Sequence, residues 1–143
     1  MIDASSLQNY SLFGGLLTEQ IEKILPLVTY TTFEAGVVIL MEGCRNDSIY
    51  FLLQGRVEVS KASQVIVELP EGQAFGEIEL LDVMPSAATV RALVPVKLAV
   101  ISNSSLHGIY CLDPCVFSIM MMNLARDLAR RLRHMDDLLV AGC

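Results

Sequence analysis

The most informative stretch of the sequence is Phe75-Gly76-Glu77-Ile78-Glu79-Leu80-Leu81, which is followed by the run DVMPSAATVRA at 82–92. Good helix formers follow the glycine, which predicts a short helix that opens at Gly76. Pro85 and several small residues then lead into a β-rich run at Thr89. Because this helix interrupts a series of short strands, we expect functional residues there, held on a rigid scaffold.

Short β-type runs surround this stretch, separated by turn residues such as Gly43, Gly55, Gly72 and Pro95. The predicted strands are Val28–Phe33, Val37–Glu42, Ser48–Leu53, Arg56–Ser60, Val65–Leu69, Thr89–Leu93 and Lys97–Ser102. Turn signals every ~8–12 residues without long intervening helices predict an antiparallel sandwich or jelly roll. We therefore expect a mainly β, cupin-like jelly roll at 28–102 with flanking helices.

Helical patterns occupy both ends of the chain. Residues 1–27 look helical, with Thr18 as the expected N-cap and Pro26 as the stop. A long helix is predicted at 116–139, where seven positions recur in steps of four and three and form an apolar seam with one charged interruption. The seam consists of Phe117, Met121, Leu124, Leu128, Arg131, Met135 and Leu138, and Leu132 can replace Arg131 if the helix drifts from heptad geometry.

Composition narrows the class of protein. The chain has 143 residues, of which 53% are hydrophobic, and its formal net charge is −6. Such a chain buries enough apolar surface to fold as one domain, and it lacks the ~18–20 residue apolar run of a membrane span. Its acidity argues against a nucleic-acid-binding surface. With no export signal at Met1-Ile2-Asp3, we expect a cytoplasmic protein whose four cysteines are free thiols.

The run at 75–92 resembles the phosphate-binding cassette of cyclic-nucleotide-binding domains. That family includes catabolite activator-type regulators, protein kinase regulatory subunits and cyclic-nucleotide-gated channels. Gly36, Glu42-Gly43 and the segment SIYFLLQGRVEV at 48–59 resemble the family's glycine-punctuated hairpins. The resemblance extends from about Phe13 to Leu132. It implies a regulatory binding module, not an enzyme, with cyclic AMP or cyclic GMP as its ligand and no other cofactor or metal.

The resemblance also implies roles for individual residues. Glu77 matches the glutamate that accepts a hydrogen bond from the ribose 2′-hydroxyl, and the backbone amides of the short helix and of Ala87 match those that hold the phosphate. An anion is favoured at such a helix N-terminus, and Gly76 lets it approach the backbone. The expected ligand-binding residues are Phe75, Gly76, Glu77, Ile78, Glu79, Leu80, Ser86, Ala87, Ala88 and Thr89.

Two positions depart from the family pattern. Ser86 stands where the family has the arginine that pairs with the phosphate, and Glu79 stands where it has a small residue. Both changes oppose an anionic ligand, since a serine gives no charged, bidentate bond. The Glu79 carboxylate is also able to fold back onto the backbone N–H groups meant for phosphate. Arg91, the nearest cation in sequence, is expected on a solvated strand face.

In related regulators a helix in the position of 116–139 forms the dimer interface. We therefore expect a homodimer through Phe117, Met121, Leu124, Leu128, Leu132 and Met135. The arginines of this helix alternate with aspartates, which indicates a solvated face, and no DNA-binding helix-turn-helix follows before Cys143.

His107, Cys111 and Cys115 have helical spacing, yet Asp113-Pro114 interrupts them. Buried thiols and an ordinary histidine are therefore expected there, and no catalytic pair stands out in the chain. Two functions remain open. The pocket senses a small molecule, either a weakly bound cyclic nucleotide or a different compound, or the pocket stays empty and the chain is a protein–protein interaction or scaffold domain.

Overall fold

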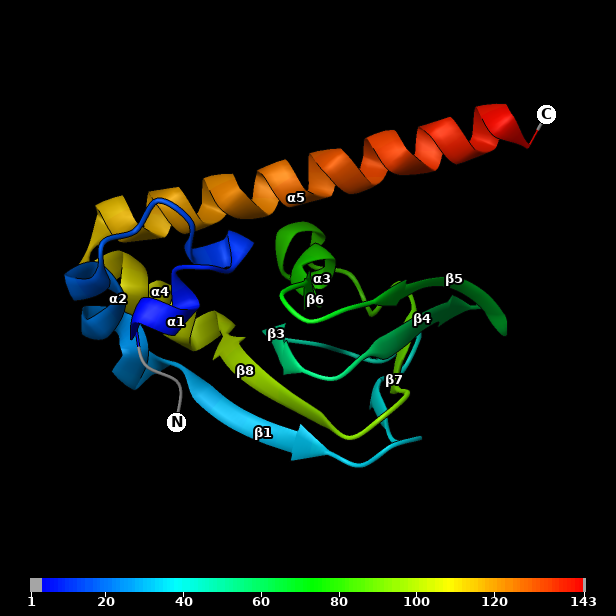
Figure 1. The fold of residues 1–143 in the computed structure, drawn as a ribbon, viewed down its shortest axis with the longest axis horizontal. Coiled ribbons are helices and arrows are strands. Elements are labelled where there is room, and N and C mark those ends of the chain that lie inside the picture. Colours follow the sequence, from blue (N-terminus) through cyan, green and yellow to red (C-terminus); the bar gives the residue numbers. More distant parts are fainter. Residues whose placement is uncertain (1–3, 143) are drawn as a thin grey trace.

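Two four-stranded antiparallel sheets form the body of the chain in a computed structural model that describes residues 4–142 (Figure 1). The strand orders are β1-β8-β3-β6 and β2-β7-β4-β5. The strands are β1 (Thr29–Phe33), β2 (Val38–Leu40), β3 (Ser48–Gln54), β4 (Val57–Lys61), β5 (Gln64–Leu69), β6 (Ala74–Phe75), β7 (Thr89–Ala92) and β8 (Val96–Ser102). This arrangement confirms the predicted jelly roll with flanking helices.

Each of the seven predicted strands is present, with ends shifted by a few residues. One strand, β6, was not predicted. It has only two residues, which is too few to show the alternation of apolar and polar side chains that marks a strand. It pairs with β3 through Tyr50–Phe75 and Phe51–Ala74. The Tyr50 and Phe75 rings stack with centroids 5.2 Å apart, so this short pairing fixes the strand that leads directly into the cassette.

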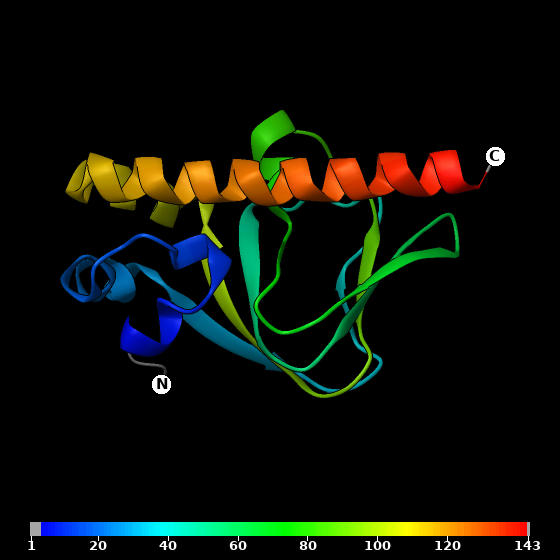
Figure 2. The same cartoon turned by 45° about the horizontal axis from the view of Figure 1, so that its top comes forward.

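The helices gather at one end of the sheets and along one side (Figure 2). They are α1 (Ala4–Leu7), η1 (Ser11–Phe13), α2 (Thr18–Ile24), η2 (Leu25–Leu27), α3 (Glu77–Asp82), α4 (Asn103–Leu112) and α5 (Pro114–Ala141). The expected N-cap at Thr18 was wrong by one residue, because Leu17 is the cap and its N–H donates to Gln20 Oε1 at 2.8 Å. The α-helix does end before Pro26, which lies in the following 3₁₀ turn.

Two hydrophobic clusters hold the fold together. One lies between the sheet β1-β8-β3-β6 and the helices, and its largest buried side chains include Phe13, Phe51 and Met120. The other lies between the two sheets and includes Leu52, Phe75 and Leu98. Phe75 therefore anchors the start of the cassette in the core, and burial of one such aromatic side chain contributes about 1.5–3 kcal/mol.

The long helix α5 begins two residues before its predicted start and ends two residues after its predicted end. Asp113 caps it by accepting hydrogen bonds from the N–H groups of Cys115 and Val116. The first half of the helix packs on the body, and Leu124 is only 3% exposed. The second half runs over the side of β4 and β5, and only its last turn passes them (Figure 2). In this half Leu132 is 65% and Leu138 is 53% exposed. Within residues 4–142, no helix combines the length and apolarity needed to cross a membrane.

Candidate functional site

The cassette begins at Gly76, which joins β6 to the short helix α3. Its φ is +85°, in the left-handed region that favours glycine. A Cβ built there would lie 2.7 Å from the backbone oxygen of Ser48 and 2.9 Å from Nδ2 of Asn46. Glycine is therefore required here both by its conformation and by close packing, and the short helix opens at Gly76 as the sequence predicted.

Gly76→Ala is expected to lower the free energy of unfolding by about 2 kcal/mol or more, because it adds a backbone clash to left-handed strain. Gly36→Ala is the matched control. Gly36 has a similar φ of +87°, yet a Cβ there meets nothing within 4 Å, so only the strain of about 1 kcal/mol applies. Urea denaturation of both variants measures the difference. Equal losses would show that the contact with Ser48 does not constrain the cassette.

A cavity of about 120 Å³ lies between the cassette, the inner face of the second sheet and α5. Its cassette walls are Phe75, Gly76, Glu77, Ile78, Glu79, Ser86, Ala87 and Ala88, and the remaining walls are Leu40, Val59, Val67, Leu69, Val90 and Arg131. We call it the cassette cavity. Eight of the ten expected ligand-binding residues therefore meet at one place. Leu80 instead lines cavities on the other side of α3, and the Thr89 hydroxyl accepts from the Glu42 N–H.

Glu77, the first residue of α3, is paired with a residue that the sequence pattern did not assign to the site. Arg131 of α5 donates from Nη1 to Glu77 Oε1 at 2.7 Å, and its Nη2 donates to the backbone oxygen of Ala74. The Glu77 side chain is 3% exposed, and its second oxygen, Oε2, is buried without a hydrogen-bond partner. The sequence held one signal of this pair, because Arg131 interrupts the apolar seam of the long helix. A charged residue at such a position needs a carboxylate nearby.

Burial raises the pKa of the Glu77 carboxyl above its ordinary value, and the Arg131 guanidinium only partly opposes this effect. A carboxyl with a raised folded-state pKa binds more protons when folded than when unfolded, so stability falls as pH rises through the interval between the two pKa values.

We therefore expect wild type to lose stability relative to Glu77→Gln, which does not titrate, as pH rises from about 4 to about 7. The loss is about 1.4 kcal/mol for every tenfold difference in proton affinity between the folded and the unfolded chain. Urea denaturation of both proteins across this range measures it. A wild-type protein that gains stability relative to the variant over the same range would contradict the assigned direction.

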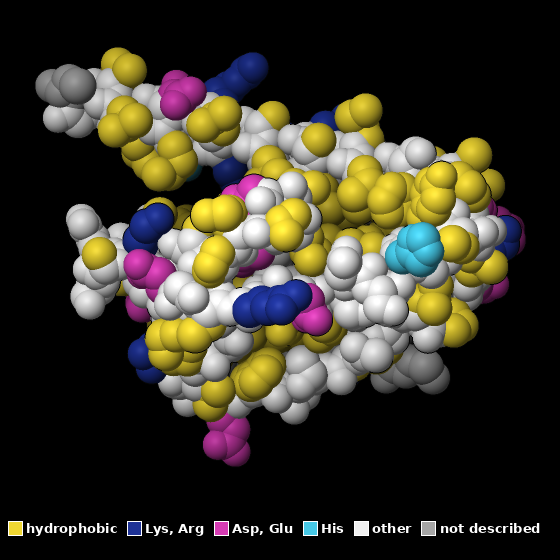
Figure 3. Space-filling view, turned by 180° about the vertical axis from the view of Figure 1, so that it is seen from behind, with side chains coloured by type: hydrophobic (Ala, Val, Ile, Leu, Met, Phe, Trp, Pro, Cys, Tyr) yellow, Lys and Arg dark blue, Asp and Glu magenta, His cyan; other side chains and the backbone are white. Residues whose placement is uncertain are grey.

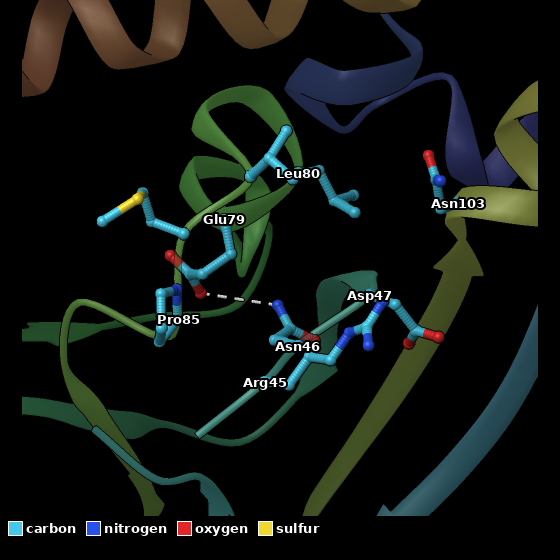
Figure 4. A pocket seen from close by; sticks show the side chains of 9 residues that line it. Arg45, Asn46, Asp47, Glu79, Leu80, Pro85 and Asn103 are labelled. Carbon is cyan, nitrogen blue, oxygen red and sulfur yellow. Dashed lines mark hydrogen bonds between the residues drawn. The ribbon is translucent and has the colours of Figure 1, made fainter. Parts of the chain in front are cut away.

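Glu79, two residues further along α3, is 7% exposed and lines both the cassette cavity and a second cavity on the outer side of α3. Figure 4 shows its carboxylate in the second cavity, pointing toward Asn46. Asn46 Nδ2 donates to its Oε1 at a long 3.4 Å. Its other oxygen has no hydrogen-bond partner within residues 4–142. The carboxylate thus does not fold back onto backbone N–H groups in this structure, and it remains an acceptor.

Ser86, for which the resemblance predicts the position of an arginine, is 5% exposed. Its Oγ donates to the backbone oxygen of Ala88 at 2.7 Å, so the hydroxyl proton is already engaged. Arg91 gives no compensating charge, since it is exposed and donates to the Gly36 oxygen at 2.9 Å. This confirms the predicted solvated position of Arg91. Arg131 is the one cation that lines the cassette cavity in the described part of the chain.

An apolar cavity of about 370 Å³ adjoins the cassette cavity and shares Arg131 with it. It lies between β4, β5, the cassette and the exposed half of α5. Its own walls include Ile66 of β5 and Met135 of α5, with Lys61 and His134 beside them. The cassette cavity, whose mostly apolar walls carry the polar groups of Glu77, Glu79, Ser86 and Arg131, thus opens beside a space suited to a flat, apolar group.

The remaining candidates from the sequence do not form a site. His107 Nε2 and Cys111 Sγ are 3.5 Å apart on α4, but the cap at Asp113 separates them from Cys115, as predicted. The prediction of buried thiols at Cys111 and Cys115 was wrong, because both are exposed, as is Cys44. Cys143 lies outside the described residues. Among residues 4–142 no group of three metal-ligating side chains occurs.

Comparisons with known proteins agree with this geometry. The family described as "Cyclic nucleotide-binding domain" matches residues 30–110. The cAMP-dependent protein kinase regulatory subunit of Yarrowia lipolytica is 30% identical over 108 residues, which are 67% of this chain and 29% of that protein. The chain therefore spans less than a third of the length of this curated relative.

Solved structures share the fold. A cyclic nucleotide-binding domain from Methylobacillus flagellatus superposes with a TM-score of 0.87 at 22% identity, covering 98% of this chain and 82% of that one. The catabolite activator protein of Thermus thermophilus superposes with a TM-score of 0.77 at 27% identity, covering 91% of this chain and 63% of that one.

Proposed function

Because the chain belongs to the cyclic-nucleotide-binding domain family, we propose that it is a regulatory module that senses a small molecule in the cassette cavity. The observation that carries this proposal is the unpartnered Oε2 of Glu77. Burying an acceptor without a partner costs about 1–3 kcal/mol, a cost that a ligand hydroxyl at this oxygen would remove. In this proposal Glu77 holds the ribose 2′-hydroxyl of a nucleotide-like ligand.

The same proposal assigns weak affinity for cyclic nucleotides to this chain. Ser86 supplies no positive charge, and the Glu79 carboxylate faces the place of the phosphate. Loss of a hydrogen bond to a charged group costs about 1.5–3 kcal/mol, or about 10–150-fold in affinity. The cassette cavity of 120 Å³ is also smaller than the ~300–1,000 Å³ of usual ligand sites. A ligand would therefore extend into the adjoining apolar cavity.

Calorimetric titration of the wild-type chain with cyclic AMP and cyclic GMP tests this function. Binding is expected to saturate only at high ligand concentration and to disappear in Glu77→Ala. The competing function is a scaffold domain with an empty pocket. The scaffold function would be favoured if neither wild type nor Ser86→Arg gave a binding signal with any nucleotide. In that case, an arginine at this position would not have restored binding.

We also propose that the module is a homodimer, joined by the exposed half of α5. Leu132, Met135 and Leu138 leave an apolar strip on this half of the helix, at 65%, 43% and 53% exposure. Leu124 of the expected interface instead packs into the core of its own chain, and Phe117 and Met121 pack against that core. The interface in this proposal therefore runs from Leu128 toward the end of α5.

A further inference from the structure

The side chains that face the cassette cavity offer hydrogen-bond acceptors and few donors. Glu77 Oε2 is buried without a donor, and Glu79 receives only one long bond from Asn46. The Ser86 hydroxyl already donates its proton to the Ala88 oxygen, so its free lone pairs also accept. These three groups require a ligand that brings its own O–H or N–H donors.

The charges at the cavity also favour an uncharged ligand that donates hydrogen bonds. Two carboxylates, Glu77 and Glu79, line it against one guanidinium. That guanidinium, on Arg131, is already bound to Glu77 and to the Ala74 oxygen. Lys61 and His134 line only the adjoining apolar cavity. A phosphate diester has acceptors alone and carries a negative charge, so it would meet carboxylates without a free cation.

The two adjoining cavities also limit the shape of the ligand. An acceptor-rich cavity opens beside an apolar one of about 370 Å³, walled by Ile66, Val67, Ile78 and Met135. A ligand that matches both has several hydroxyl groups at one end and a flat, largely apolar ring at the other. Hydroxyl groups donate and accept, so they can satisfy the carboxylates and also receive a backbone N–H of the cassette.

We propose that the ligand is an uncharged nucleoside, with its 2′-hydroxyl on Glu77 and its 3′- or 5′-hydroxyl on Glu79. The base then occupies the adjoining apolar cavity. This inference rests on the proposed sensing function and names its ligand class. In this chain Glu79 and Ser86 act together as a selectivity device, because they exclude the cyclic phosphate and bind the hydroxyl groups that replace it.

The test compares each nucleoside with its own cyclic nucleotide. Wild-type chain is titrated by calorimetry with adenosine, guanosine, cyclic AMP and cyclic GMP. We expect the better nucleoside to bind at least about tenfold more tightly than its cyclic phosphate. In Glu79→Ala, affinity for the nucleoside should fall about tenfold while affinity for the cyclic nucleotide rises, so the preference reverses. Glu22→Ala removes the same charge at an exposed position of α2, away from the cavity walls, and should change neither affinity.

The outcomes separate this inference from the function on which it rests. Tighter binding of cyclic AMP than of adenosine to wild type overturns the inference and leaves the sensing function in place. The same holds if no nucleoside binds wild type while Ser86→Arg binds cyclic AMP, because the cavity is then intact. If no variant binds any of the four compounds, the inference and the sensing function both fail.

Discussion

Ser86→Arg is expected to raise the affinity for cyclic AMP by about tenfold to 150-fold, the range that corresponds to one charge-assisted hydrogen bond. Ser86 is buried at the cassette cavity beside Ala87 and Ala88, so an arginine there would enter the space proposed for the phosphate. Its side chain would also supply the first cation at this cavity that is not already paired with Glu77. Calorimetric titration with cyclic AMP measures the gain.

Glu79→Ala should raise the affinity further in the Ser86→Arg background by removing a carboxylate from the same place. Because both residues face one phosphate, their effects should couple instead of adding independently. Glu77→Ala, introduced into this double variant, should reverse much of the gain by deleting the ribose contact. Ser104→Arg is the control, since it adds the same charge on the exposed surface of α4.

One result would contradict this interpretation of the cassette. If wild type bound cyclic AMP tightly and neither Ser86→Arg nor Glu79→Ala changed the affinity, the positive charge would have to come from another residue. Arg131 would then be the first candidate, because it already lines the cavity, and its release from Glu77 would become part of binding.

Leu132→Lys combined with Leu138→Lys is expected to convert a dimer into a monomer. These side chains are 65% and 53% exposed on the second half of α5. A buried lysine without a partner is strongly unfavourable at an apolar interface. Met135 is left unchanged because it also lines the apolar cavity. Leu124→Lys is unsuitable, since Leu124 belongs to the core and its loss would unfold the chain.

Sedimentation at micromolar concentration measures the mass of each species. Ala129→Lys is the matched control, because it adds the same charge at an exposed position outside the seam and should leave a dimer intact. The dimer proposal fails if the wild-type chain sediments as a monomer under these conditions.

The exposed surface supports an interface of this kind. Figure 3 shows apolar side chains along α5, with some charged groups between them on its far half, and a dense apolar groove below its first half. β5 adds Val65, Ile66 and Val67, which are 54%, 43% and 40% exposed. Large exposed apolar patches on a folded chain usually mark interaction sites. A second copy that covers the exposed half of α5 would remove part of this surface from water.

Local patterns predicted most of the fold. The strands follow from short β-type runs between glycines, and α3 follows from helix formers after Gly76, whose left-handed φ only a glycine adopts easily. The strand β6 escaped prediction because two residues carry no periodicity. The helix α4 escaped it because its sequence mixes serine, histidine and glycine with apolar residues, which gives a weak amphipathic pattern.

The site could be predicted only in part, for a different reason. The cassette residues are contiguous in sequence, so the resemblance to a known family located them together. Arg131 lies 54 positions from Glu77, and no local pattern reports their contact at 2.7 Å. Likewise, the resemblance predicts that Ser86 stands in place of an arginine, but only the fold shows that its hydroxyl donates to the backbone oxygen of Ala88. Charge at a site depends on such long-range pairings.

Whether the cassette cavity is the ligand site can be measured by an amide NMR titration. The wild-type chain, labelled with ¹⁵N, is titrated with adenosine and separately with cyclic AMP. We expect saturable shifts of the Gly76, Ala87 and Ala88 amide signals, at lower concentration for adenosine, while the signals of α2 stay in place. Unmoved cassette signals at saturating ligand, or shifts confined to other parts of the chain, would show that the ligand does not bind in this cavity.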